Sequence, residues 1–131
     1  MLDTNVCVAL LRGNPTVVDR LADAQLDDLR TSTITIFELS YGAAKSGRSE
    51  EFAKVRGLMA HRIQAVHVTE DDAEVAGRLR ADLAARGEII GAYDLLIAGQ
   101  ALARDWTVVT ANTREFARVR GLRTEDWTTS T

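Results

Sequence analysis

Residues 1–13, MLDTNVCVALLRG, place an aspartate between two apolar residues and an apolar run. A carboxylate at that point either caps the helix that the run predicts or belongs to a functional site at the end of a short strand. Because only Met1 and Leu2 precede Asp3, we expect either a very short first strand or a chain that begins upstream of Met1. The rest of the chain decides which role Asp3 has.

The composition is that of an ordinary globular protein, with 46% hydrophobic and 27% charged residues among 131. This length predicts a single domain over residues 1–131, and no apolar segment approaches the roughly 18 residues that a membrane span needs. The single cysteine, Cys7, excludes an internal disulfide, and no basic stretch precedes the first apolar run as it would in a signal peptide. We therefore expect a cytoplasmic protein that has no membrane partner.

The net charge of -3 argues against a protein that coats nucleic acid through bulk positive charge. Any nucleic acid would have to be bound by a local basic patch. Five arginines lie between positions 104 and 123, and within this cluster Arg114 and Arg118 are the candidates for contact with RNA. The alternative is a solvated surface without a ligand.

Short apolar or β-branched segments alternate with amphipathic ones along the whole chain. Strands are predicted at 32–35, 64–68, 106–110 and 122–127, and helices at 14–24, 36–47, 49–63, 70–87, 93–105 and 113–119. In the helix 70–87, Val75, Leu79 and Leu83 repeat every four residues. Strands separated by helices pair in parallel, so we expect a three-layer α/β/α domain with a small twisted parallel sheet.

Acidic residues follow the predicted strands. Asp3 ends the first strand, Glu38 lies in the helix after 32–35, and Asp94 begins the apolar helix 93–105. Thr110, Asn112 and Glu115 follow the strand 106–110. Ligands bind at the carboxyl ends of the strands in open parallel sheets, so we expect these residues to converge on one edge.

Each of these residues also has a local explanation. Thr35 and Glu38 fit a capping box, and an acid at position 94 favours the positive end of its helix. Glu115 lies in a short polar helix, and Asn112 is typical of a turn. Taken singly, none of these residues requires a functional site.

Together the acids indicate a cation. Two carboxylates about 4 Å apart repel by roughly 4 kcal/mol at an effective dielectric constant near 20, and no lysine or histidine stands next to these acids in the sequence. Oxygen ligands select Mg²⁺ or Mn²⁺ over zinc. The pattern therefore favours a metal-dependent phosphoryl-transfer or phosphodiester-cleaving site, and His61 and His67 are expected in structural or surface roles.

Four ordered motifs resemble the PIN-domain ribonucleases, specifically the VapC-type toxins of bacterial type II toxin-antitoxin systems. They are LDTNV at 2–6, TITIFELSYGAAKS at 33–46, GEIIGAYDLLIAGQALA at 87–103 and VVTANTREFARVRGL at 108–122. The resemblance covers nearly the whole chain and implies a PIN-like fold.

The resemblance also implies roles for particular residues. Asp3, Glu38 and Asp94 would form the catalytic metal site, with Asp3 and Asp94 the most direct Mg²⁺ ligands. Glu115 stands where the family usually has aspartate, so it is an outer-sphere candidate. The residues expected to orient the carboxylates, or a water on the ion, are Asn5, Thr110 and Asn112.

As an activity, the resemblance implies an endoribonuclease toxin that cleaves structured RNA with a metal-activated water, Mn²⁺ being able to replace Mg²⁺. It further implies a homodimer and a cognate VapB-type antitoxin, which would fill a groove and push a basic side chain into the acidic site.

Two other functions remain open from the sequence. One is a non-catalytic PIN-like binding module with a vestigial site. The other is an aspartyl-phosphate phosphatase or receiver domain with Asp3 as nucleophile, although the phosphatase pattern requires a second aspartate where this chain has Asn5.

Overall fold

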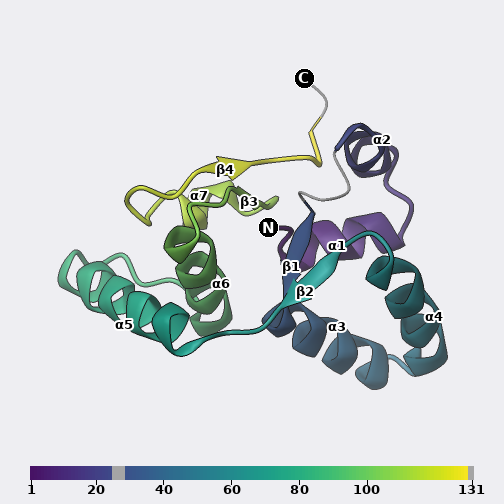
Figure 1. Ribbon diagram of the computed structural model, residues 1–131, viewed down its shortest axis with the longest axis horizontal. Helices are drawn as coiled ribbons and strands as arrows, with labels where there is room; N and C mark the ends of the chain where they lie inside the picture. Colours follow the sequence, from purple (N-terminus) through teal and green to yellow (C-terminus); the bar gives the residue numbers. More distant parts are fainter. Residues whose placement is uncertain (25–28, 130–131) are drawn as a thin grey trace.

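The computed structural model describes residues 1–24 and 29–129 (Figure 1). The elements in chain order are α1 (Thr4–Leu11), α2 (Pro15–Asp23), β1 (Arg30–Ser32), α3 (Thr33–Lys45), α4 (Ser49–Ala60), β2 (Gln64–Val66), α5 (Glu70–Ala85), α6 (Ala92–Ala103), β3 (Val108–Val109), α7 (Thr113–Phe116) and β4 (Thr124–Glu125). Helix and strand alternate as predicted.

A small parallel sheet forms through the second residue of the chain. β1 pairs in parallel with β2, and β3 pairs in parallel with β4. Leu2 makes parallel bridges to both Thr31 and Val109, so it joins the two ladders in the order β2, β1, Leu2, β3, β4. The predicted α/β class is confirmed. The first strand consists only of the two bridges of Leu2, which agrees with the expectation of a very short strand.

The predicted strand 32–35 is wrong in its position. β1 ends at Ser32, whose side chain accepts a hydrogen bond from the backbone N–H of Ile34 at 3.0 Å and so caps α3. Thr35 is therefore a buried residue in the first turn of α3, not its cap. The capping box with Glu38 does not form, and that leaves the Glu38 carboxylate free for other partners.

Other element boundaries are close to those predicted. Asn14 caps α2 by accepting from the N–H groups of Thr16 and Val17, and Gly47 and Gly87 adopt positive φ angles just after α3 and α5. The strands are shorter than predicted because each runs only as far as its parallel neighbour. The segments predicted at 64–68, 106–110 and 122–127 shrink to β2, β3 and β4, and the helices at 49–63 and 113–119 end at 60 and 116.

Close packing of α5 on α6 fixes the helix that carries Asp94. A Cβ atom at Gly99 would lie 2.9 Å from the Cβ of Ala76, so only glycine allows this approach of the two helices. Of the predicted stripe on α5 only Leu83 is fully buried, Leu79 is half-buried against the same core, and Asp72 and Ala76 are buried beside them. The centre of α6 is buried nearly all round, as predicted.

An ion pair ties the same two helices together. Arg104 Nη1 lies 2.5 Å from Asp72 Oδ1 and also donates to the carbonyl of Gln100 at 3.0 Å. The Arg104 guanidinium and hydrogen bonds at Thr69 outweigh burial and hold the pKa of Asp72 below its usual value. The ion pair thus joins the C-terminal end of α6 to the first turn of α5.

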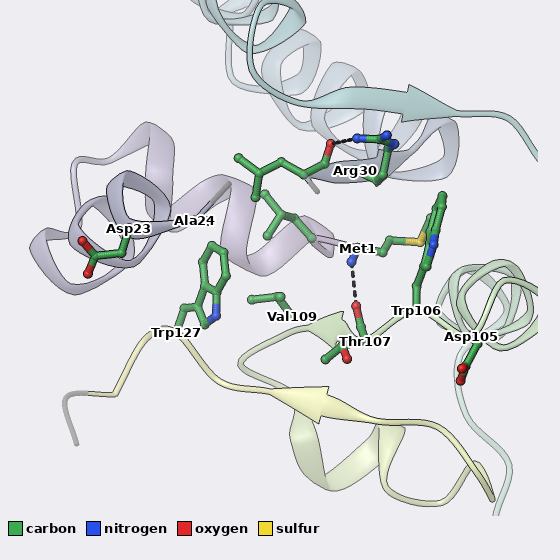
Figure 2. A pocket seen from close by; sticks show the side chains of 11 residues that line it. Met1, Asp23, Ala24, Arg30, Asp105, Trp106, Thr107, Val109 and Trp127 are labelled. Atoms are coloured by element: carbon green, nitrogen blue, oxygen red, sulfur yellow. Dashed lines mark hydrogen bonds between the residues drawn. The ribbon is translucent and has the colours of Figure 1, made fainter. Parts of the chain in front are cut away.

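Cys7 lies one turn after Asp3 on α1, and a cavity lies at the amino ends of the strands. Burial raises the pKa of the Cys7 thiol to about 12, so Cys7 serves packing rather than nucleophilic chemistry. A cavity of about 600 Å³ opens at the amino ends of the strands, and Figure 2 shows Trp106 and Trp127 on either side of Met1 there. In the described part of the chain, no helix has the length and apolarity to span a membrane.

Candidate active site

Asp3 both caps a helix and faces the predicted site. Its Oδ1 accepts a hydrogen bond from the N–H of Val6 at 3.2 Å, which caps α1. Its Oδ2 accepts from the Thr110 hydroxyl, as the prediction of an orienting role for Thr110 requires. The side chain is 2% exposed, and burial raises the pKa of its carboxyl against the opposing effect of these hydrogen bonds.

Glu38 is held by a residue that the sequence analysis missed. Glu38 lies in the second turn of α3, and its Oε1 accepts from the Thr4 hydroxyl at 2.7 Å. The same hydroxyl lies 3.3 Å from that of Thr35. Its position directly after Asp3 is the only feature of the sequence that could have indicated this role for Thr4. The hydrogen bond links the start of α1 to α3.

Asp94 shows that the acids share one region. It lies in the first turn of α6, and burial is the largest of the effects that raise its pKa to about 7. The charges of Glu115, Asp3 and Glu38 raise it further, in that order. The predicted convergence of these acids from separate segments is thus present, since each affects the ionisation of Asp94.

Glu115 is bonded on both oxygens. Its Oε1 accepts from the N–H of Gly91 at 2.8 Å, and its Oε2 accepts from the Asn112 side chain. The backbone N–H of Asn112 in turn donates to the Thr110 hydroxyl at 2.8 Å. Asn112 therefore orients Glu115 directly and Asp3 only through Thr110.

Among the described residues, the side chains of three further predicted residues form no hydrogen bond or ion pair with the acids. Asn5 is exposed, and within residues 1–24 and 29–129 its side chain has no hydrogen-bond partner. Arg114 is exposed on α7. Arg118 donates to the carbonyl of Ile89 at 3.0 Å, so its guanidinium already supports the loop before α6. Contact of either arginine with RNA stays a prediction.

The donor set fits a hard divalent cation in charge and in donor type. In the described part of the chain, none of the four acids forms an ion pair with a lysine, arginine or histidine. No three Asp, Glu, His or Cys side chains among the described residues form a ready-made metal cage. Mg²⁺ is usually held by one or two carboxylates and several waters, so such a cage is not required.

Comparison with known proteins gives a family. Residues 1–122 match the model of the PIN domain family. The chain is 41% identical over 128 residues to the tRNA(fMet)-specific endonuclease VapC of Shigella flexneri, covering 97% of this chain and 96% of that protein. It is 34% identical over 129 residues to ribonuclease VapC2 of Rickettsia felis, again covering 97% and 96%.

Solved structures agree with these relatives. DNA-bound VapBC from Salmonella typhimurium is similar with a TM-score of 0.89 and 40% identity, over 97% of this chain and 96% of that one. VapBC2 from Rickettsia felis, bound to a DNA fragment from its promoter, has a TM-score of 0.86 and 31% identity, over 97% of each chain.

The raised pKa of Asp94 predicts how stability depends on pH without divalent ions. Because the folded state holds this proton up to about pH 7, stability falls as pH rises from about 4 to 7. Asp94→Asn removes that cost, so in EDTA the variant should gain about 1–2 kcal/mol over the wild type at pH 8, after allowance for solvent screening, and almost nothing near pH 4. Urea unfolding at several pH values measures this difference.

The matched control is Asp19→Asn, an exposed aspartate of α2. Its stability difference from the wild type should not change between pH 4 and 8. A pH-independent difference for Asp94→Asn as well would contradict the raised pKa.

Proposed function

The chain belongs to the PIN-domain family, in its VapC group, and we propose that it is a Mg²⁺-dependent endoribonuclease that cleaves structured RNA in the cytoplasm. One observation carries the proposal: burial and the charges of acids from three other segments raise the pKa of Asp94 to about 7, and none of these acids has a basic partner within the described residues. Neighbouring carboxylates without a basic partner are suited to bind a divalent cation, which the phosphate of the substrate can also coordinate.

The chain's own residues would hold and orient the ion. Asp3 and Asp94 are the proposed direct ligands, and Glu38 is the third carboxylate of the metal site. Mg²⁺, or Mn²⁺ in its place, would polarise the scissile phosphate and lower the pKa of the attacking water. Thr110 fixes one oxygen of Asp3, and the N-terminal turn of α1 fixes the other, so this carboxylate is oriented before any ion arrives.

Replacing either proposed ligand by its amide should abolish cleavage without unfolding the protein. An asparagine at position 3 can still cap α1, and Asp94→Asn relieves repulsion, so both variants should fold. We expect Asp3→Asn and Asp94→Asn to cleave structured RNA at least about 100-fold more slowly than the wild type, and EDTA to stop the wild-type reaction. Mapping of new 5′-phosphate ends on the RNA measures the activity.

Asp19→Asn is again the matched control and should cleave at the wild-type rate. Undiminished cleavage by folded Asp94→Asn would remove that residue from the site. If the wild type binds Mg²⁺ and RNA but yields no new ends, the protein is a non-catalytic binding module instead.

We extend the proposal to a toxin neutralised by a VapB-type antitoxin, because the similar structures from Salmonella typhimurium and Rickettsia felis are VapBC complexes. A groove of about 490 Å³ runs between α1, α3 and α4. Its lining is partly apolar, through Val8, Leu11, Leu39 and Phe52, and it reaches the acidic site at Glu38. An antitoxin segment with apolar side chains and a basic residue at one end would match this groove.

Filling the groove should weaken antitoxin binding. Gly42 lines it, and a Cβ atom at this position would meet nothing within 4 Å, so larger side chains fit the fold but occupy the groove. Calorimetry should show Gly42→Leu binding the cognate antitoxin at least about tenfold more weakly, a cost of about 1.4 kcal/mol, while Gly42→Ala stays within threefold. Equal affinity of all three proteins would place the antitoxin elsewhere.

We also propose that a second copy covers an exposed apolar face beside the acids. This aromatic face consists of Phe37, Tyr41 and Tyr93, whose exposed fractions are 46 to 61%. The rings of Phe37 and Tyr93 lie 5.3 Å apart between centroids, tilted by 60°. Large apolar side chains gathered on a surface mark protein interfaces, which favours a homodimer.

A charge in the aromatic face should dissociate the dimer. Tyr41→Glu keeps a helical partner in Lys45, four residues on, but would bury a carboxylate in the interface. Sedimentation equilibrium should give a dimer dissociation constant at least about tenfold higher than for the wild type, with Tyr41→Phe unchanged. Dimers of equal strength in Tyr41→Glu would exclude this face as the interface.

A further inference from the structure

We propose that Glu115 is a positioning residue that sets the spacing between Asp3 and Asp94 through a continuous chain of hydrogen bonds. The inference rests on the proposed nuclease function, since it assigns a role within that site. It differs from the expectation that Glu115 serves the ion as an outer-sphere acid.

The chain of hydrogen bonds begins at Asp3. The fully buried Thr110 hydroxyl donates to Asp3 Oδ2 and accepts from the backbone N–H of Asn112 at 2.8 Å. A hydroxyl has one proton, so the N–H of Asn112 directs that proton toward Asp3. The position of the Asp3 carboxylate is thereby coupled to the loop after β3.

Asn112 passes the connection to Glu115. Asn112 stands at the N-cap of α7, yet its side chain makes no capping bond there and instead donates to Glu115 Oε2. The other oxygen of Glu115 accepts from the N–H of Gly91 at 2.8 Å. Both oxygens are thus held by protein donors, so the side chain is fixed in position.

Gly91 completes the connection to Asp94. Gly91 is the N-cap of α6, and its own N–H donates to the Glu115 carboxylate from α7, which places a negative charge at the positive end of α6. The N–H of Leu95 bonds to the Gly91 carbonyl at 2.9 Å, which builds the turn containing Asp94 on Gly91. A Cβ at Gly91 would lie 3.7 Å from Glu115 Oε1 and 4.0 Å from Asp94 Oδ2, so both carboxylates lie beside Gly91.

A double-mutant cycle separates positioning from metal ligation. The variants are Glu115→Ala, Asn112→Ala and the double variant, with Glu74→Ala, an exposed acid of α5, as the control. Asn112→Ala is decisive because it breaks the chain but keeps every acid. We expect each single variant to lower kcat for Mg²⁺-dependent cleavage by about tenfold with KM within twofold, and the double variant to be no worse than either.

Calorimetric titration with Mg²⁺ gives a readout besides activity. All four proteins should bind Mg²⁺ within about threefold of the wild type, because the direct ligands remain. A loss of tenfold or more in Glu115→Ala alone, with Asn112→Ala unchanged, would make Glu115 a ligand and overturn the proposal. So would fully additive effects on kcat.

Exchange of the Gly91 amide proton, followed by NMR in EDTA, tests the hydrogen bonds whether or not the protein is a nuclease. Exchange should be at least about tenfold faster in Glu115→Ala than in the wild type. If the wild type does not cleave RNA, the proposed function fails while this measurement still judges the chain of hydrogen bonds. Unprotected exchange in the wild type would refute that chain.

Discussion

The pairing of Leu2 on both sides is the constraint on which the structure depends. The N–H of Leu2 donates to the carbonyl of Arg30 at 2.8 Å, and the N–H of Asp3 donates to that of Val109 at 2.9 Å. Without this segment the strands would be two separate two-stranded ladders, which have little stability of their own. Because Leu2 pairs with both ladders, Asp3 follows it between the end of β1, where α3 with Glu38 begins, and the end of β3.

Neutral donors hold the acids at that edge. Thr110 and the first turn of α1 fix Asp3, and Thr4 fixes Glu38, but none of these groups carries a positive charge. An arginine or lysine in their place would stabilise the fold more and would also neutralise the site. Hydroxyl and amide donors orient each carboxylate without neutralising its charge. The remaining repulsion between the acids lowers the stability of the fold, and it contributes to the raised pKa of Asp94.

Residues at the end of an element could be predicted from the sequence, whereas contacts between elements could not. The positions of Asp3 and Asp94 follow from the alternation of strands and helices and the rule that parallel strands end on one edge. The β-branched run at 33–35 suggested a strand, but the cap at Ser32 makes it helical. The inner face of α5 differs from its four-residue repeat because Gly99 lets another helix approach at Ala76, which no local pattern reveals.

The supports of the site illustrate the same limit more sharply than the fold does. By local rules Asn112 should cap its own helix, and Gly91 should begin α6 without a cap. In the folded protein neither helix has a side-chain cap, and Glu115 accepts from both the Asn112 side chain and the Gly91 N–H, although its own short helix would explain it as a solvated acid. The acids can be recognised in the sequence because carboxylates are typical metal ligands. The hydrogen bonds that orient them depend on distances that only the tertiary structure determines. The acids in a sequence therefore predict the charge of the ligand, but they do not predict the geometry that binds it.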